Sequence, residues 1–279
     1  MFSKLIKYDL KYTFKYWWIM ALSSVGLSVI GGIGFRILNS DIQNDEATLA
    51  YFFSVIALLL SVLGLSAFML ATLIFVYMRY YKNFFTDEGY LTFTLPVKRI
   101  ELLNSKILSA FLTNAATSAV IALDVAIIFS IGVDPKILLH AFDGINDLAG
   151  ILFGNGAERI PSIILYPITA IALAMLTSLF SILAIFACIT FASVITKKNK
   201  VLAAIGIYYL GSGILSVAGQ VLAIFGAAAI AGLSEIISKD LIWVIILLGL
   251  WLAVAFIAII CLLLYLAIYR MLDKKLNLA

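Results

Sequence analysis

Six long stretches with almost no charged residues constrain this chain more than any other feature. They cover residues 17–37, 49–78, 107–133, 162–196, 201–232 and 241–269. Each is longer than the ~20 residues that an α-helix needs to cross the ~30 Å hydrocarbon core of a bilayer. All six are apolar on every side, whereas membrane β-strands alternate apolar and polar residues over about 10 positions. The sequence therefore predicts an all-α integral membrane protein with six transmembrane helices.

Composition excludes the main alternative, a soluble enzyme. Of the 279 residues, 64% are hydrophobic and 12% are charged, whereas soluble domains contain roughly 45–50% apolar and 25% charged residues. A soluble domain of this size still exposes about a quarter of its chain surface and needs polar residues to cover it. Lipid must therefore cover much of this chain.

The basic residues predict the orientation. With six spans, both termini lie on one side of the membrane, and that side collects fifteen of the nineteen Lys and Arg residues. The other side holds only Arg36, Lys136, Arg159 and Lys239, set among most of the acidic residues. The positive-inside rule then places both termini in the cytoplasm. We expect the protein in the cell membrane. The net charge of +4 reflects this sorting, so it does not indicate a nucleic-acid partner.

The first sixteen residues form a predicted amphipathic helix before the first span. Apolar residues recur there at near-helical spacing, while the lysines lie mostly elsewhere around the helix. Such a helix can rest in the headgroup layer, with its lysines toward anionic phosphates. A solvated start of the first span is the alternative. We thus expect an interfacial helix at 1–16 and a transmembrane domain at 17–279, with Trp17 and Trp18 at the membrane boundary.

No residue pattern of a catalytic or metal site is found in the sequence. It contains no phosphate-binding loop, nucleophile elbow or zinc-protease motif. Cys188 and Cys261 lie inside predicted spans, and the one histidine, His140, lies in the predicted outer loop 134–160. These residues do not form the spaced ligand sets that metals need. We therefore expect no enzyme activity and no cofactor in this chain itself.

The predicted cytoplasmic loop 79–106 has the most specific sequence. Its central part, YKNFFTDEGYLTFTLPV at 81–97, joins an aromatic run to an acidic turn and a proline. Gly89 suits a position with φ above zero, and Pro96 suits the start of a new helix. Apolar side chains beside fixed charges on the watery side predict a docking surface for a cytoplasmic partner. Anchoring of helices at the interface is the alternative role for these aromatic residues.

This loop resembles the corresponding segment of permease subunits in type 2 ATP-binding-cassette (ABC) exporters, especially those of Firmicutes. The C-terminal RMLDKKLNL at 270–278 also resembles the tail of those subunits. The resemblance implies that two such permeases, either two copies or sister chains, pair above separate ATPase subunits that bind ATP and Mg. It also implies that the loop transmits ATPase closure to the membrane helices. The residues expected to do so are Phe85, Asp87, Glu88, Gly89, Tyr90 and Leu91.

One feature departs from that family. Many type 2 exporters carry a sizeable outer insertion between the fifth and sixth spans, whereas here only about residues 233–240 separate them. The longer outer segment is 134–160 instead. An outer gate like that of other members is therefore not expected.

Polar and small residues inside the spans suggest where helices meet. Asp124 is the one acidic residue deep in a span, where a charge costs ~2.5–3.5 kcal/mol. We expect either an ion pair with Arg36 or a role facing the substrate or carrying a proton. Asn114 and Gln220 are candidates for cavity lining or for helix-to-helix hydrogen bonds. A stripe of small residues predicts helix packing or a dimer seam and consists of Gly219, Ala223, Ala227 and Ala231.

The leading functional hypothesis is an ATP-driven exporter permease for an amphipathic peptide, a drug-like molecule or a lipid-like molecule. An ion-gradient-driven secondary transporter is a second hypothesis. It predicts an internal repeat and several midplane ionisable groups, and Asp124 has no counterpart in the last three spans. A membrane scaffold or sensor without transport is a third hypothesis.

Overall fold

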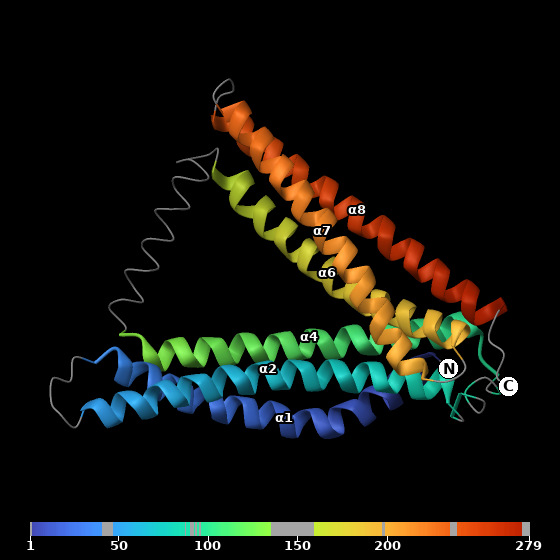
Figure 1. Ribbon diagram of the computed structural model, residues 1–279, viewed down its shortest axis with the longest axis horizontal. Helices are drawn as coiled ribbons and strands as arrows, with labels where there is room; N and C mark the ends of the chain where they lie inside the picture. Colours follow the sequence, from blue (N-terminus) through green and yellow to red (C-terminus); the bar gives the residue numbers. More distant parts are fainter. Residues whose placement is uncertain are drawn as a thin grey trace. The chain divides into compact units, whose positions relative to one another are not determined.

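The computed structural model describes residues 2–40, 47–86, 88–89, 92, 94, 96–134, 159–196, 199–234 and 239–274. These residues form six long helices and no strand (Figure 1), so the prediction of an all-helical chain is confirmed. The helices are α1 (Phe2–Leu38), α2 (Ala47–Phe85), α4 (Arg99–Gly132), α6 (Arg159–Ile195), α7 (Lys200–Ser234) and α8 (Lys239–Lys274). Each helix covers one of the six predicted spans, although α4 and α6 end one residue before the predicted ends at 133 and 196.

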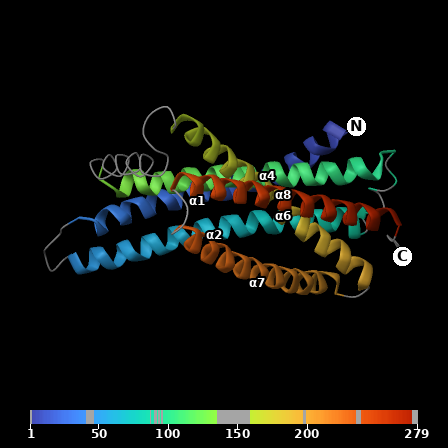
Figure 2. The same ribbon diagram turned by 90° about the horizontal axis from the view of Figure 1, so that it is seen from above.

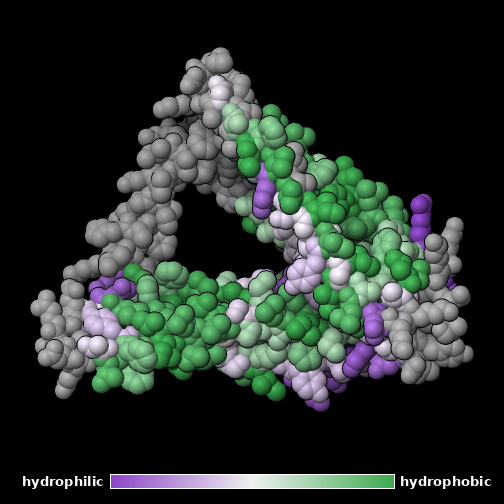
Figure 3. Space-filling model, viewed as in Figure 1, coloured by the Kyte–Doolittle hydropathy of each residue, from purple (hydrophilic) through white to green (hydrophobic). Residues whose placement is uncertain are grey.

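The six helices have the length and the surface of membrane helices. All are long enough and apolar enough to cross a bilayer. Large apolar side chains lie exposed along them, for example Leu22 at 68%, Leu63 at 62% and Leu252 at 71% exposure. Figure 3 shows the same surface as broad hydrophobic areas over the described helices. Because soluble monomers rarely expose apolar patches of such extent, the structure indicates a multi-pass membrane protein.

The helices extend beyond the predicted spans on the side that carries most of the basic residues. α1 runs without a break from Phe2 to Leu38 over 37 residues, so the predicted segments 1–16 and 17–37 form one helix about 55 Å long. That length exceeds the ~40–45 Å of a bilayer with its headgroups. α2 likewise continues to Phe85, and α4 begins at Arg99, eight residues before the predicted span.

The chain divides into two compact units, and the division falls inside α2 and α4. Unit 1 comprises residues 1–79 and 104–160, and unit 2 comprises residues 80–103 and 161–279. Unit 1 therefore contains α1 with most of α2 and α4. Unit 2 contains the ends of α2 and α4, the segment between them, and α6, α7 and α8. α7 and α8 contact one another.

The core of unit 1 combines aromatic packing with buried hydroxyl groups. Trp17, Ala21 and Phe68 form a buried cluster between α1 and α2. The indole Nε1 of Trp17 donates a 2.9 Å hydrogen bond to the hydroxyl of Thr117 in α4. Trp17 thus ties α1 to both neighbouring helices, and Figure 2 shows α1, α2 and α4 running alongside one another.

α1 and α2 approach closely where both carry small residues. A Cβ added to Gly34 would lie 2.9 Å from the backbone oxygen of Ser54 and 3.1 Å from the Cβ of Ala57, and one added to Gly31 would collide with the side chain of Ser61. Small residues allow membrane helices to bring their backbones together. The structure therefore describes small-residue packing between α1 and α2. On the predicted stripe in α7, Gly219 is exposed with open space beside it, and the other three side chains lie outside the described set.

Gly34→Ala should destabilise unit 1 by about 1–3 kcal/mol, because its methyl group meets a backbone oxygen that cannot move without shifting α2. SDS titration of the purified protein in mixed micelles measures this change. Gly26→Ala in the same helix is the matched control, since a Cβ there meets nothing within 4 Å. The control should be neutral or stabilising by up to ~1 kcal/mol. Equal effects of the two variants would contradict close packing at Gly34.

α7 has the least packing of the six helices. Only 6% of its most apolar window is buried. All six of its glycines, at positions 206, 211, 213, 219, 226 and 232, have open space where a side chain would extend. Exposed apolar residues such as Leu210 at 72% and Phe225 at 70% lie between them. Few contacts among the described side chains therefore stabilise α7.

Candidate functional site: the segment between α2 and α4 and two buried acids

The predicted coupling segment begins on a buried aromatic base at the end of α2. Phe84 is fully buried and Phe85 is 8% exposed. Tyr80, one turn earlier, stacks on Phe186 of α6 with ring centroids 3.7 Å apart and shares a 2.9 Å hydrogen bond with Thr190. These contacts hold the end of α2 against α6 within unit 2. Phe85 is thus part of the base. The aromatic residues at the end of α2 are mostly buried against other helices and do not form an exposed surface.

The residues after this base form a tight turn. The backbone N–H of Gly89 donates a 2.7 Å hydrogen bond to the carbonyl of Thr86. Gly89 is buried and helical, so its expected φ above zero is wrong. A glycine is required there for another reason, because a Cβ would lie 2.8 Å from the carbonyl oxygen of Phe84. Glu88, its neighbour, is exposed. Asp87, Tyr90 and Leu91 lie outside the described residues.

The same segment is connected to the end of α8. The Arg99 guanidinium donates hydrogen bonds to the carbonyl oxygens of Leu272 at 3.1 Å and Asp273 at 2.9 Å. Its Nη1 also lies 3.3 Å from the Asp273 carboxylate, and both side chains are about half exposed. An arginine satisfies the last carbonyls of a helix in this way. Segments 79–106 and 270–278 are therefore in contact within unit 2 through Arg99.

Asp9 is the centre of a buried ion cluster that joins three helices of unit 1. Its carboxylate accepts hydrogen bonds from Arg79 Nη2 at 2.6 Å and Nε at 2.9 Å. Lys106 Nζ lies 2.7 Å from Oδ1 and 2.6 Å from Oδ2. Asp9 and Lys106 are 4% and 8% exposed. Two cations thus share one carboxylate. The ring of Tyr12 lies under Arg79, 4.1 Å from the guanidinium carbon to the ring centroid.

The sequence interpretation missed this cluster. It assigns Asp9 to an interfacial helix, and it treats Arg79 and Lys106 as basic residues of the cytoplasmic side and as the ends of the loop. One signal was available, since Asp9 is the one acidic residue among the four lysines of residues 1–16. A lone carboxylate in a basic helix is expected to find cations when the helix packs, because an isolated buried charge is costly.

Asp124 is fully buried in α4 of unit 1, and neither carboxylate oxygen has a hydrogen-bond partner among the described residues. The expected pair with Arg36 is not formed, because the two residues lie at different levels. Gly32 of α1 lies opposite Ile128 and Ile131 of α4, and the Asn39 amide donates to the carbonyl of Gly132. Arg36 is therefore level with the end of α4, roughly 12 Å along the bundle from Asp124, and it is exposed.

The remaining predicted residues are not gathered into a site. Asn114 is half-buried in α4 of unit 1, and Gln220 is exposed on α7 of unit 2. Cys188 and Cys261 are both free thiols. His140 lies outside the described residues, and those that are described contain no group of three metal-ligating side chains.

Comparison with known proteins finds no matching family model, no similar curated protein and no similar solved structure.

Proposed function

We propose that this chain is the permease subunit of an ATP-driven ABC exporter, with both termini in the cytoplasm of a cell and a separate ATPase as its partner. The partner ATPase binds ATP and Mg, and a second permease, either a copy or a sister chain, completes the pathway. The supporting observation is the segment between α2 and α4. Its exposed acidic residue Glu88 lies beside the buried Gly89 in a turn that follows the buried aromatic base of Phe84 and Phe85.

This arrangement suits a coupling element. A docking contact can move membrane helices only if the docked residue is fixed to those helices. Here the turn that carries Glu88 follows directly on the buried Phe84 and Phe85 at the end of α2. Tyr80, also at the end of α2, packs on Phe186 of α6. On the other side of the turn, Arg99 at the start of α4 donates hydrogen bonds to the end of α8. A push on the turn would therefore reach three helices of unit 2.

A photo-crosslinking amino acid at position 88 in native membranes tests the partner. We expect it to capture a polypeptide whose sequence contains an ATPase phosphate-binding loop. The same amino acid at Asp134 is the matched control, because Asp134 is also exposed but follows the opposite end of α4. Capture of no such ATPase at position 88, or equal capture at both positions, would contradict the proposal.

Charge reversal at Glu88 should weaken binding of the ATPase without affecting folding of the permease. We expect Glu88→Lys to reduce the amount of co-purified ATPase about tenfold, which corresponds to ~1.4 kcal/mol, because the substitution places a cation where the partner meets an acid. The amount of membrane-inserted protein should stay unchanged, since Glu88 is exposed. Gly89→Ala changes the shape of the turn without changing its charge, and we expect it to weaken ATPase binding too. Undiminished ATPase recovery with both variants would rule out this turn as the contact.

An ion-gradient-driven secondary transporter is a second candidate, favoured by the buried carboxyl of Asp124. Under that candidate Asp124→Asn abolishes complementation of the gene-deletion phenotype, and Glu88→Lys leaves it intact. The exporter proposal expects Glu88→Lys to abolish it. The two variants in one complementation assay therefore separate the candidates.

A further inference from the structure

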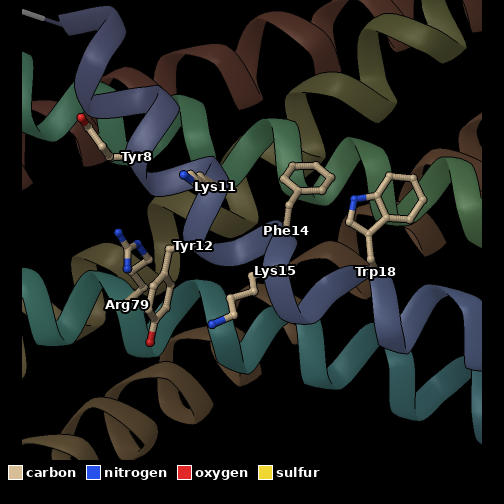
Figure 4. A pocket seen from close by; sticks show the side chains of 7 residues that line it. All are labelled: Tyr8, Lys11, Tyr12, Phe14, Lys15, Trp18 and Arg79. Carbon is tan, nitrogen blue, oxygen red and sulfur yellow. The ribbon is translucent and has the colours of Figure 1, made fainter.

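A pocket of about 700 Å³ opens on the surface of unit 1 near the start of α1. Six of its seven lining residues come from α1 and one from α2 (Figure 4). They are Tyr8, Lys11, Tyr12, Phe14, Lys15, Trp18 and Arg79. Its volume lies within the ~300–1,000 Å³ typical of small-molecule sites. Three of the seven residues are cations and four are aromatic, so the pocket offers positive charge beside apolar walls.

The positive charge of the pocket is not cancelled by nearby acids. No carboxylate lines it. Asp9 pairs with Arg79, and the same carboxylate also pairs with Lys106, so Arg79 shares this acid with a second cation. Lys11 and Lys15 are exposed, and no ion pair joins either of them to a described carboxylate. The pocket therefore attracts an anionic group.

The position of the pocket along α1 matches the headgroup layer of a bilayer. Trp18 at the end of the pocket is 59% exposed. An exposed apolar surface begins at the next residue, since Ile19 and Leu22 are each 68% exposed. Exposed tryptophan and tyrosine beside lysine are typical of the membrane interface. An anion bound here would carry its apolar part toward Ile19 and Leu22.

The rings of Tyr12, which lines the pocket, and of its neighbour Tyr16 favour an anion over a quaternary ammonium group. A choline headgroup needs free aromatic faces. Here the ring of Tyr12 already lies against Arg79, and the neighbouring Tyr16 ring stacks on Phe75 and lies 5.5 Å from Lys15 Nζ. The cations of the chain itself thus occupy these rings.

We propose that this pocket binds the phosphate of an anionic phospholipid. Lys11 and Lys15 contact the phosphate oxygens, and Trp18 and Phe14 line the path of the first acyl carbons. The lipid site does not depend on the exporter proposal, because it uses residues of unit 1 and no ATPase.

Native mass spectrometry of the detergent-purified protein with added phosphatidylglycerol tests the site. We expect Lys11→Gln/Lys15→Gln to weaken retention of the lipid roughly 10- to 30-fold, since each lysine near an anionic surface contributes about a fivefold change. Lys4→Gln/Lys7→Gln is the matched control, because it removes the same charge from exposed positions of α1 outside the pocket. The control should change retention less than threefold.

Three further measurements identify the ligand. Phosphatidylcholine should bind at least tenfold more weakly than phosphatidylglycerol, and Trp18→Ala should weaken phosphatidylglycerol retention. Inorganic phosphate at the same concentration should not displace the lipid, because it has no apolar part for Trp18 and Phe14. Equal losses in the two double variants would overturn the site and leave only general attraction to the basic helix. Displacement by inorganic phosphate would overturn the lipid as its ligand.

Discussion

Asp9→Asn is expected to lower the stability of unit 1 by about 3–5 kcal/mol. The substitution removes the carboxylate and leaves Arg79 and Lys106 facing one another, with Lys106 only 8% exposed. Removal of one partner from a buried ion cluster costs this much because the remaining charges lose their compensation. SDS titration in mixed micelles measures the change, followed through the fluorescence of Trp17 and Trp18 in a background with Trp243→Phe and Trp251→Phe, the other two of the four tryptophans.

A matched control for Asp9 lies in unit 2. Asp273→Asn removes an ion pair whose two side chains are about half exposed, and exposed pairs contribute about 0–1 kcal/mol. Asp9→Asn combined with Lys106→Met should recover part of the loss, because it also removes the most deeply buried cation. If Asp9→Asn costs no more than Asp273→Asn, the cluster does not hold the three helices together.

Asp124→Leu is expected to stabilise unit 1 by about 2.5–3.5 kcal/mol. Leucine has the same branching as aspartate and replaces each carboxylate oxygen by a methyl group. The oxygens of Asp124 are fully buried and have no hydrogen-bond partner among the described residues, so their loss removes a desolvation cost without breaking a described contact. The same SDS titration measures the gain.

Asp124→Asn is the companion variant for this prediction. It keeps a polar group of the same shape and should recover only a small part of the gain, since an amide without partners is also costly when buried. A loss of stability with leucine would show that Asp124 has a structural partner in the folded protein. A gain with leucine would mean that the carboxyl is retained for activity at the expense of stability.

The six helices could be predicted from sequence because each is a long run without charge. Their ends were harder to predict. The polar residues 2–16 and 79–85 continue the helices, and hydrophobicity gives no signal where a helix leaves lipid but remains regular. Side-chain packing stabilises these helix extensions, as where Tyr80 stacks on Phe186. A sequence does not show which distant ring will be the partner.

The candidate site shows the same limit. The motif indicates Glu88 and Gly89. However, the end of α2 before them packs on α6, and Arg99 after them contacts α8, each more than 100 residues away in the chain. The Asp9 cluster and the level of Asp124 depend on the register of α1 against α4. Composition and periodicity describe one helix at a time, so they do not determine such registers.

The exposed glycines of α7 have a practical consequence for handling the protein. Glycine is among the weakest helix formers, and few side-chain contacts within the chain offset that weakness. The order of α7 must therefore come from its surroundings, whether lipid or another subunit. Extraction with a short-chain detergent removes those surroundings first, so a purified sample can keep α1, α2 and α4 intact while α7 has already frayed.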